Sequence, residues 1–423
     1  MNNKKKNNTR AALLVTIVFI VVLLYAGVMM VMRAVDEAKD DKPKEKTVQS
    51  ESMVIETKIP DTEPVQETQE EDPLDQEVKE ILDGMTTEEK VAQLFMITPE
   101  SLTGVDGVTL AGDASKEAYD NYPVGGVIYF TQNLISPEQT KEMLSNMQAY
   151  SKERTGLPLL ISVDEEGGTV TRIAGNSNFD VETIENMSEV GAGGDIDRAY
   201  EIGTILGGYL SELGFNMDFA PDADVLSNPD NQVVRERSFG SDPELVSAMV
   251  SQELRGLKEN GVYGVLKHFP GHGATQGDTH EGYAYTDKSL EELTGNELIP
   301  FQRGIDSGAS FVMVGHISVP TVLGDNTPSS LSSVMVTDVL RNQMGFNGVI
   351  ITDALDMGAV AQAYTSQEAA VAALLAGVDM LLMPENFQEA YQGVLDAVSN
   401  GTITQERLDT SVARILKVKV SMQ

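Results

Sequence analysis

The stretch that decides the fold runs from Phe311-Val-Met-Val314 to Val349-Ile-Ile351. Each end is a short apolar run with β-branched residues, and the helical pattern Val334–Gln343 lies between them. Such runs predict strands that are buried on both faces, and a helix between two of them predicts parallel neighbours in one sheet. The stretch is therefore interpreted as a strand–helix–strand unit.

The same alternation repeats along most of the chain. Six further apolar runs predict strands at Val91–Ile97, Gly125–Phe130, Leu159–Val163, Met217–Ala220, Tyr263–Leu266 and Val378–Met383. Helical patterns lie at Pro137–Lys152, Ile196–Leu213, Pro243–Glu259, Leu290–Ile305, Gln367–Leu375 and Phe387–Val398. Eight strands alternating with helices predict an α/β fold, a (β/α)8 barrel of the TIM type that forms a single domain over residues 76–423. A doubly wound open sheet is the alternative.

The first 75 residues differ from the predicted barrel. Residues 1–10 are basic, and residues 11–32 form an uncharged run that is long enough to cross a bilayer core of roughly 30 Å. We expect a transmembrane signal anchor with a cytoplasmic basic head and the rest of the chain outside the cell membrane. Cleavage as a secretory signal peptide is the alternative. Residues 33–75 are rich in acidic residues and lack apolar periodicity, which predicts a disordered linker.

Composition restricts the possible functions. The 423 residues carry a formal net charge of -35, and this argues against a nucleic-acid partner because phosphate binding needs clustered Lys and Arg. The absence of Cys excludes disulfides, thiolate metal sites and a Cys nucleophile. We expect an enzyme without cofactor or metal, and a monomer.

Polar residues follow five of the predicted strands, where (β/α)8 barrels place their active sites. They include Asp164 after the third strand, Asp222 and Asp224 after the fourth, Lys267-His268 after the fifth, His316 after the sixth and Asp353 after the seventh. Three of the four histidines, His268, His272 and His280, lie within the 14 residues Lys267–His280. This clustering indicates a functional loop.

These motifs carry a resemblance to a known family. Lys267–His280, with Asp164-Glu-Glu-Gly-Gly168, Arg237-Ser-Phe-Gly240 and Ile351-Thr-Asp-Ala-Leu355, resembles glycoside hydrolase family 3 in its β-N-acetylglucosaminidase branch. The resemblance covers about residues 76–420. It implies a catalytic barrel with β-N-acetylhexosaminidase activity, which removes non-reducing terminal β-linked N-acetylglucosamine with retention of configuration.

The resemblance also implies a role for each matching residue. Asp353 matches the nucleophile that forms a covalent glycosyl-enzyme, His280 the general acid/base, and Asp278 its dyad partner. The matches to residues that hold the terminal sugar are Asp164, Arg172, Arg237, Lys267 and His268, while Asp224 and His316 are given supporting roles. The sequence departs from the family's pattern at Ala274 and Thr169, and this puts the leaving-group preference in doubt. The chain ends soon after Arg407–Lys419, so we expect no second domain to supply an acid/base.

The chemistry is consistent with the residues themselves. An imidazole, with an ordinary pKa near 6.5, can protonate a leaving oxygen and then accept a proton from water, and a neighbouring Asp fixes its tautomer. We expect peptidoglycan fragments ending in GlcNAc-MurNAc as the carbohydrate substrate. The alternatives are a β-glucosidase-type family 3 enzyme, a tethered sugar-binding module without catalysis, and a zinc hydrolase that uses His268, His272 or His316 with Asp353.

Overall fold

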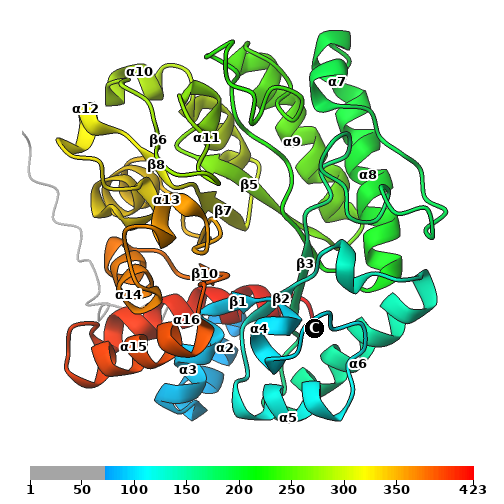
Figure 1. The fold of residues 1–423 in the computed structure, drawn as a ribbon, viewed down its shortest axis with the longest axis vertical. Coiled ribbons are helices and arrows are strands. Elements are labelled where there is room, and N and C mark those ends of the chain that lie inside the picture. The colour runs from blue at the N-terminus through cyan, green and yellow to red at the C-terminus, as the bar shows by residue number, and fades with distance from the viewer. Residues whose placement is uncertain (1–71) are drawn as a thin grey trace, which may run out of the picture. The chain divides into compact units, whose positions relative to one another are not determined.

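Eight parallel strands form the centre of the computed structural model, which describes residues 72–423 (Figure 1). In their order around the sheet they are β10 (Leu381–Leu382), β1 (Phe95–Ile97), β2 (Gly126–Ile128), β3 (Leu160–Val163), β4 (Met217–Asp218), β5 (Tyr263–Phe269), β7 (Phe311–Val314) and β9 (Val349–Thr352). A parallel bridge between Ile351 and Met380 joins β9 to the segment before β10 and closes the ring. The predicted (β/α)8 barrel is thus confirmed.

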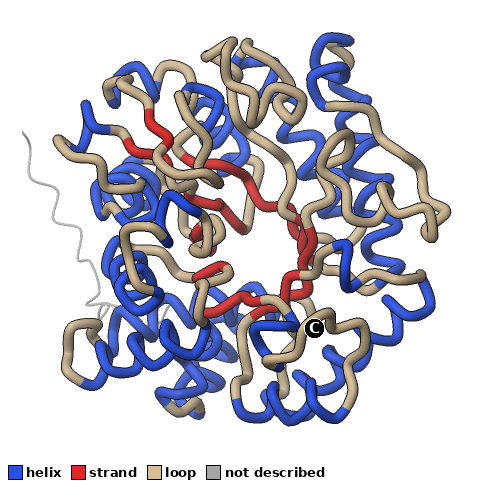
Figure 2. The backbone as a smooth tube through the Cα atoms, in the orientation of Figure 1, coloured by secondary structure: helices blue, strands red, loops and turns tan. Residues whose placement is uncertain are grey.

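Helices lie outside the ring of strands, as Figure 2 shows. The α-helices are α2 (Pro73–Gly84), α3 (Thr87–Gln93), α4 (Pro99–Thr103), α5 (Asp113–Asn121), α6 (Pro137–Thr155), α7 (Met187–Gly193), α8 (Ile196–Leu213), α9 (Pro243–Glu259), α10 (Leu290–Thr294), α11 (Leu298–Asp306), α12 (Pro320–Leu323), α13 (Gly358–Ala361), α14 (Ser366–Ala376), α15 (Phe387–Ser399) and α16 (Gln405–Val420). A π-helix spans Val334–Gln343, and short 3-10 turns lie at Thr131–Asn133, His272–Ala274 and Ser329–Leu331. Strands β6 (Ala284–Tyr285) and β8 (Ile317–Ser318) form a separate parallel pair.

The barrel is held by burial of its apolar strands. Every strand residue of the ring is buried except Tyr263, which is half-buried, and most of these residues are apolar, as is typical of parallel strands covered on both faces. Outside them, α8 and α9 approach closely at Gly203, where an added Cβ would lie 2.2 Å from the Glu253 carbonyl oxygen. A side chain at this position would therefore force the two helices apart.

Some predicted boundaries were wrong. The run Val91–Ile97 is not one strand: a capping box between Thr86 and Glu89 starts α3, which continues to Gln93, and β1 begins only at Phe95. The pattern Leu290–Ile305 forms two helices, since α10 ends at Thr294 and α11 begins at Leu298; the buried carboxylate of Glu297, just before α11, accepts hydrogen bonds from Ser227 and Asn296.

Strand β5 extends to Phe269, so Lys267 and His268 lie within a strand rather than after it. Helix α2 begins at Pro73, three residues before the expected domain boundary, after an Asp72 side chain that caps it.

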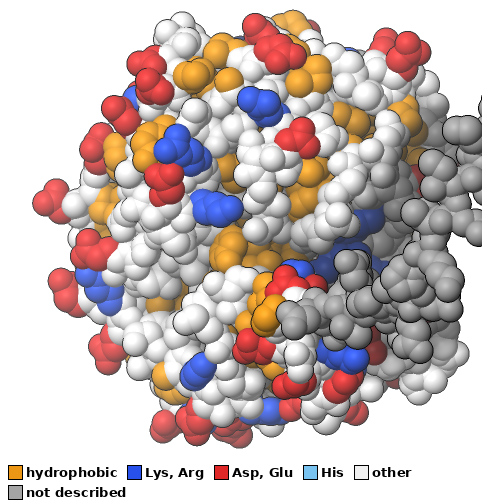
Figure 3. All heavy atoms as spheres, turned by 180° about the vertical axis from the view of Figure 1, so that it is seen from behind, with side chains coloured by type: hydrophobic (Ala, Val, Ile, Leu, Met, Phe, Trp, Pro, Cys, Tyr) orange, Lys and Arg blue, Asp and Glu red, His pale blue; other side chains and the backbone are white. Residues whose placement is uncertain are grey.

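The expected basic head, signal anchor and all but the last four residues of the acidic linker fall on residues 1–71, outside the described residues. Among residues 72–423, no helix is both long and apolar enough to cross a membrane. Figure 3 shows the face opposite to that of Figure 1, where acidic side chains are spread over the described part of the surface. Much of the acidic excess therefore lies where water solvates the charges.

Candidate active site

A pocket of about 550 Å³ opens at the carboxyl ends of the barrel strands. It is lined by all eight side chains predicted from the sequence to form the site, namely Asp164, Arg172, Arg237, Lys267, His268, Asp278, His280 and Asp353. These residues are separated by up to 189 positions in the sequence, between Asp164 and Asp353. Closure of the barrel brings them to one place.

Strand β5 presents two consecutive side chains to this pocket. Side chains alternate between the faces of a regular strand, but the pairing of β5 with β7 changes register between Leu266 and Phe269. Lys267 and His268 lie in this irregular part, and both line the pocket. The Lys267 ammonium group is buried and lies 2.9 Å from Asp164 Oδ1.

Glu166 is the centre of the charge network at the base of the pocket. Its two oxygens accept from Arg237 at 2.8 and 2.7 Å, and Lys267 forms an ion pair with it. Burial would raise the pKa of Glu166, but the two cations outweigh this effect and hold it well below its usual range. Arg237 and Lys267 therefore stay charged and fixed in position.

The ring of His268 is oriented by contacts on both sides. Its Nδ1 donates to Asp224 Oδ2 at 2.7 Å, and its Nε2 accepts from Arg237 Nη2 at 3.2 Å. Burial and the Arg237 charge lower the pKa of His268 to about 4, so the ring is neutral near pH 7. Burial also raises the pKa of Asp224 to about 6. Because both ring nitrogens are engaged, His268 orients Arg237 as well as lining the pocket.

Asp353 follows β9, and its carboxylate is held by the backbone of the next residue, Ala354. Its Oδ1 accepts from the Ala354 amide at 2.8 Å, and the Ala354 carbonyl accepts from His316 Nε2 at 2.8 Å. Burial would raise the pKa of Asp353, but His268 and His316 outweigh it and the net direction is downward. The carboxylate is therefore ionised and positioned, as a nucleophile requires.

Asp278 and His280 lie on a lobe that we define as residues 277–284. The lobe is closed at its base by Gln276 and Tyr285, whose backbones exchange hydrogen bonds of 2.9 and 3.0 Å. Asp278 Oδ1 accepts from His280 Nδ1 at 2.8 Å, and the imidazole is 64% exposed. A carboxylate can only accept here, so Nδ1 carries a proton and Nε2 remains the atom that can exchange one.

Comparison with known proteins identifies the family. The model of the glycosyl hydrolase family 3 N-terminal domain matches residues 86–418. The chain belongs to glycosyl hydrolase family 3.

Relatives within family 3 cover most of the barrel. The Beta-hexosaminidase of Chromobacterium violaceum is 37% identical over 293 residues, which are 67% of this chain and 79% of the relative. Beta-hexosaminidase A of Pseudoalteromonas piscicida is 33% identical over 333 residues, 72% of this chain but only 55% of the relative. The solved structure of a family 3 beta-N-acetylglucosaminidase from Paenibacillus sp. has a TM-score of 0.74 and 37% identity, and the match covers 80% of this chain and 63% of that one. The chain thus spans less than two thirds of the latter two proteins.

The sequence prediction missed several residues of this family 3 site. Glu166 and Asp356 line the pocket but were given no role, and the buried His272, which contacts the dyad lobe, was considered only as a zinc ligand. A signal existed for Glu166, since it lies two residues after Asp164 at the end of a strand. Its role as the partner of both Arg237 and Lys267 depends on three separate segments.

One group of described residues could hold a metal ion. Asp222, Asp224 and His268 place one potential ligand atom each within 4.8 Å of one another. Arg237 already lies beside them, with Nε 3.7 Å from Asp222 Oδ2. A fixed cation in this position disfavours a second one, and the absence of a metal cofactor stays a prediction.

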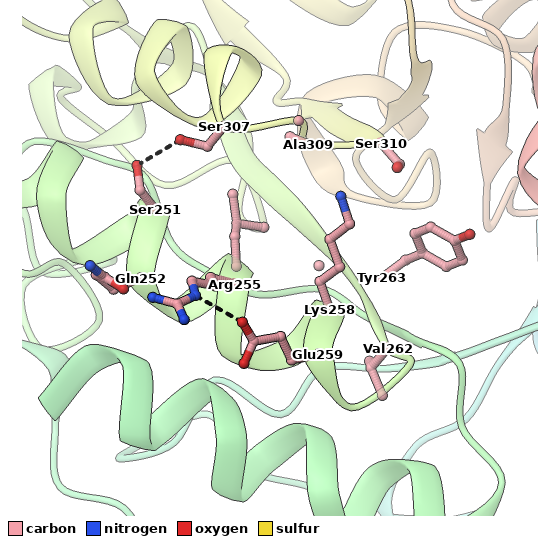
Figure 4. A pocket seen from close by; sticks show the side chains of 13 residues that line it. Ser251, Gln252, Arg255, Lys258, Glu259, Val262, Tyr263, Ser307, Ala309 and Ser310 are labelled. Carbon is pink, nitrogen blue, oxygen red and sulfur yellow. Dashed lines mark hydrogen bonds and ion pairs between the residues drawn. The ribbon is translucent and has the colours of Figure 1, made fainter. Parts of the chain in front are cut away.

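A second concavity lies at the other end of the barrel strands. The pocket of about 520 Å³ shown in Figure 4 lies between α9 and the end of α11, beside the first residues of β5. Its lining includes the Arg255–Glu259 ion pair and Ser251, which contacts Ser307. The predicted catalytic residues line the pocket at the carboxyl ends instead, where barrel enzymes carry their chemistry.

Proposed function

We propose that this family 3 protein is a retaining exo-β-N-acetylglucosaminidase. The observation that carries the proposal is the shared pocket of Asp353 and the Asp278–His280 dyad, in a chain whose relatives include proteins named beta-hexosaminidases and a beta-N-acetylglucosaminidase. A retaining glycosidase needs a nucleophile and a separate acid/base on the two sides of one bond.

In the first step, His280 Nε2 donates its proton to the glycosidic oxygen while Asp353 attacks the anomeric carbon. The bond to the leaving group breaks and a glycosyl–Asp353 ester forms. Asp278 supports the reaction because its carboxylate accepts from Nδ1 and stabilises the protonated ring before transfer.

In the second step, the neutral Nε2 takes a proton from water, and the water oxygen attacks the anomeric carbon. The ester bond breaks, Asp353 is released as a carboxylate, and the sugar leaves with its original configuration. The exposed position of His280 allows the leaving group to depart and water to enter on the same side.

The base of the pocket supplies the groups for holding the terminal sugar. Lys267, Asp164 and Arg237 are fixed by one ion-pair network and present charged donors and acceptors to hydroxyl groups. Arg172 lines the same pocket, and its Nη2 lies 3.9 Å from Asp164 Oδ2, so it adds a second cation beside Asp164.

For the natural substrate, we propose N-acetylglucosamine β-linked to MurNAc in peptidoglycan fragments. The support is the resemblance together with the expected signal anchor at residues 11–32, which would hold the barrel on the outer face of the cell membrane. Protease accessibility of the barrel on intact cells, compared with lysed cells, tests this location.

The full chain should release nitrophenol from 4-nitrophenyl β-N-acetylglucosaminide and much less from the β-glucoside. NMR of the first-formed product should show the β-anomer, and an Asp353→Ala variant should be inactive on both substrates. A preference for the glucoside would overturn the sugar assignment, and an initial α-anomer would overturn the retaining mechanism. Adding phosphate and looking for a sugar 1-phosphate distinguishes water from phosphate as the acceptor.

A further inference from the structure

The dyad lobe is docked on the segment that follows the nucleophile. Three successive carbonyls of the lobe accept hydrogen bonds from residues 358–362, which we call the docking segment. The Ala359 amide donates to Thr279 at 3.1 Å, the Gly358 amide to His280 at 3.3 Å, and Gln362 Nε2 to the Glu281 carbonyl at 3.0 Å. The lobe is therefore held along its backbone, while the His280 side chain, among the described residues, bonds only to Asp278 within the lobe.

The fit at Gly358 leaves no room for a side chain. An added Cβ would lie 2.9 Å from the His280 carbonyl oxygen and 3.0 Å from the Glu281 carbonyl carbon. The backbone of Gly358 itself is compatible with alanine, since its φ lies outside the left-handed region. Alanine here would act by displacing the lobe.

The lobe is also contacted from the barrel side. His272 Nε2 lies 3.3 Å from the Thr279 hydroxyl, and His272 Nδ1 lies 3.0 Å from the Thr275 hydroxyl. The Thr279 side chain is buried between the dyad residues, which are both more exposed. The lobe is thus contacted from two sides, at its backbone by the docking segment and at the Thr279 hydroxyl by His272.

We propose that the docking segment, through Gly358 and Gln362, positions the Asp278–His280 dyad over the bond to be cleaved. Asp353 precedes Gly358 by only five residues, so one segment carries the nucleophile and also determines where the acid/base stands. The inference rests on the proposed function, in which His280 protonates the leaving group. Gly358 and Gln362 are positioning residues, because they act through the dyad and need not touch the sugar.

The expected effect is modest and depends on the substrate. One hydrogen bond of ordinary net strength changes the docked-to-undocked ratio by roughly 2- to 10-fold. An undocked lobe removes the proton donor, which an unactivated sugar leaving group needs far more than nitrophenolate does. The variants Gln362→Met and Gly358→Ala should therefore lower kcat/KM for the disaccharide GlcNAc-β-1,4-GlcNAc by about 2- to 10-fold. The value for the nitrophenyl glycoside should fall less.

Two matched controls are available in the same full-length chain. Gln392→Met removes an exposed amide that donates to Asp396 on α15, and Gly193→Ala adds a methyl group where nothing lies within 4 Å. Both should leave the two kcat/KM values unchanged. Azide, which replaces water without needing a base, should raise nitrophenyl turnover in the two docking variants and not in the controls.

Hydrogen exchange tests docking without any activity. The amides of residues 277–284 should exchange faster in Gln362→Met and Gly358→Ala than in the parent chain and the controls, while the melting temperature changes little. Unchanged exchange, or an equal loss of kcat/KM on both substrates, would overturn the proposal. If the parent chain instead prefers glucosides, the sugar assignment fails, and the same comparison with nitrophenyl glucoside and cellobiose still decides the role of the docking segment.

Discussion

Replacing Lys267 by methionine tests the charge network at the base of the pocket. The side chain is 2% exposed, and its ammonium group faces Asp164 at 2.9 Å and the equally buried Glu166. Methionine keeps most of the volume but removes the charge. Glu166 keeps its paired contact with Arg237, whereas Asp164 keeps only Arg172, at 3.9 Å.

The magnitude follows from burial. Removing one partner of a buried ion pair costs about 3–5 kcal/mol of unfolding free energy, because the remaining charge is left uncompensated. A described domain of about 350 residues has an unfolding entropy of roughly 0.7 kcal/mol per kelvin, so the melting temperature should fall by about 4–7 °C. Loss of a charge-assisted hydrogen bond to a sugar hydroxyl should lower kcat/KM by a further ~10- to 150-fold.

The assay compares Lys267→Met with Lys417→Met by denaturant unfolding, calorimetry and nitrophenyl release. Lys417 is also ion-paired, to Asp75 at 2.5 Å, but the two side chains are 49% and 56% exposed. An exposed pair contributes about 0–1 kcal/mol, so Lys417→Met should change stability little and activity not at all. Equal stability losses in the two variants, or full activity in Lys267→Met, would refute the reasoning.

Three further predictions concern pH, the dyad and metals. Burial lowers the pKa of Lys419 to about 7, so the unfolded state binds the proton more tightly and stability should rise as pH increases from 7 to 10.5. Lys419→Met should therefore stabilise the protein below pH 7. Removing the buried charge should raise the free energy of unfolding by up to roughly 5 kcal/mol, and this gain is reduced by about 1–3 kcal/mol because Gln93 loses its hydrogen-bond partner. Urea unfolding at several pH values should show that the gain vanishes near pH 10.5. Asp278→Asn should lower kcat/KM for a disaccharide at least ~10-fold and affect nitrophenyl glycosides less, since it weakens proton donation by His280; an equal loss on both substrates would contradict this role. EDTA should leave the rate unchanged, and inhibition that zinc reverses would instead indicate a metal site.

Local sequence signals predicted much of this protein. Apolar runs placed all eight strands of the barrel, because buried parallel strands need continuous apolar residues. Polar residues at the ends of those runs predicted the site, since a barrel gathers the carboxyl ends of its strands at one face. Asp164 and Asp353 were found in this way and line the same pocket. Their chemical roles came from family resemblance and stay predictions.

The sequence alone therefore determined the fold class and those site residues that follow strands, such as Asp164 and Asp353, because hydrophobic periodicity and strand-end polarity are local properties. Only the tertiary structure decided how those residues act on one another. The register change in β5 turns both Lys267 and His268 toward the pocket, and Glu166 joins them to Arg237. The docking segment meets the dyad lobe across about 80 residues of chain. Such contacts arise when closure of the barrel brings distant segments together. The sequence of the docking segment carries no local signal that it will meet the dyad lobe, and the sequence of the lobe carries none of the docking segment.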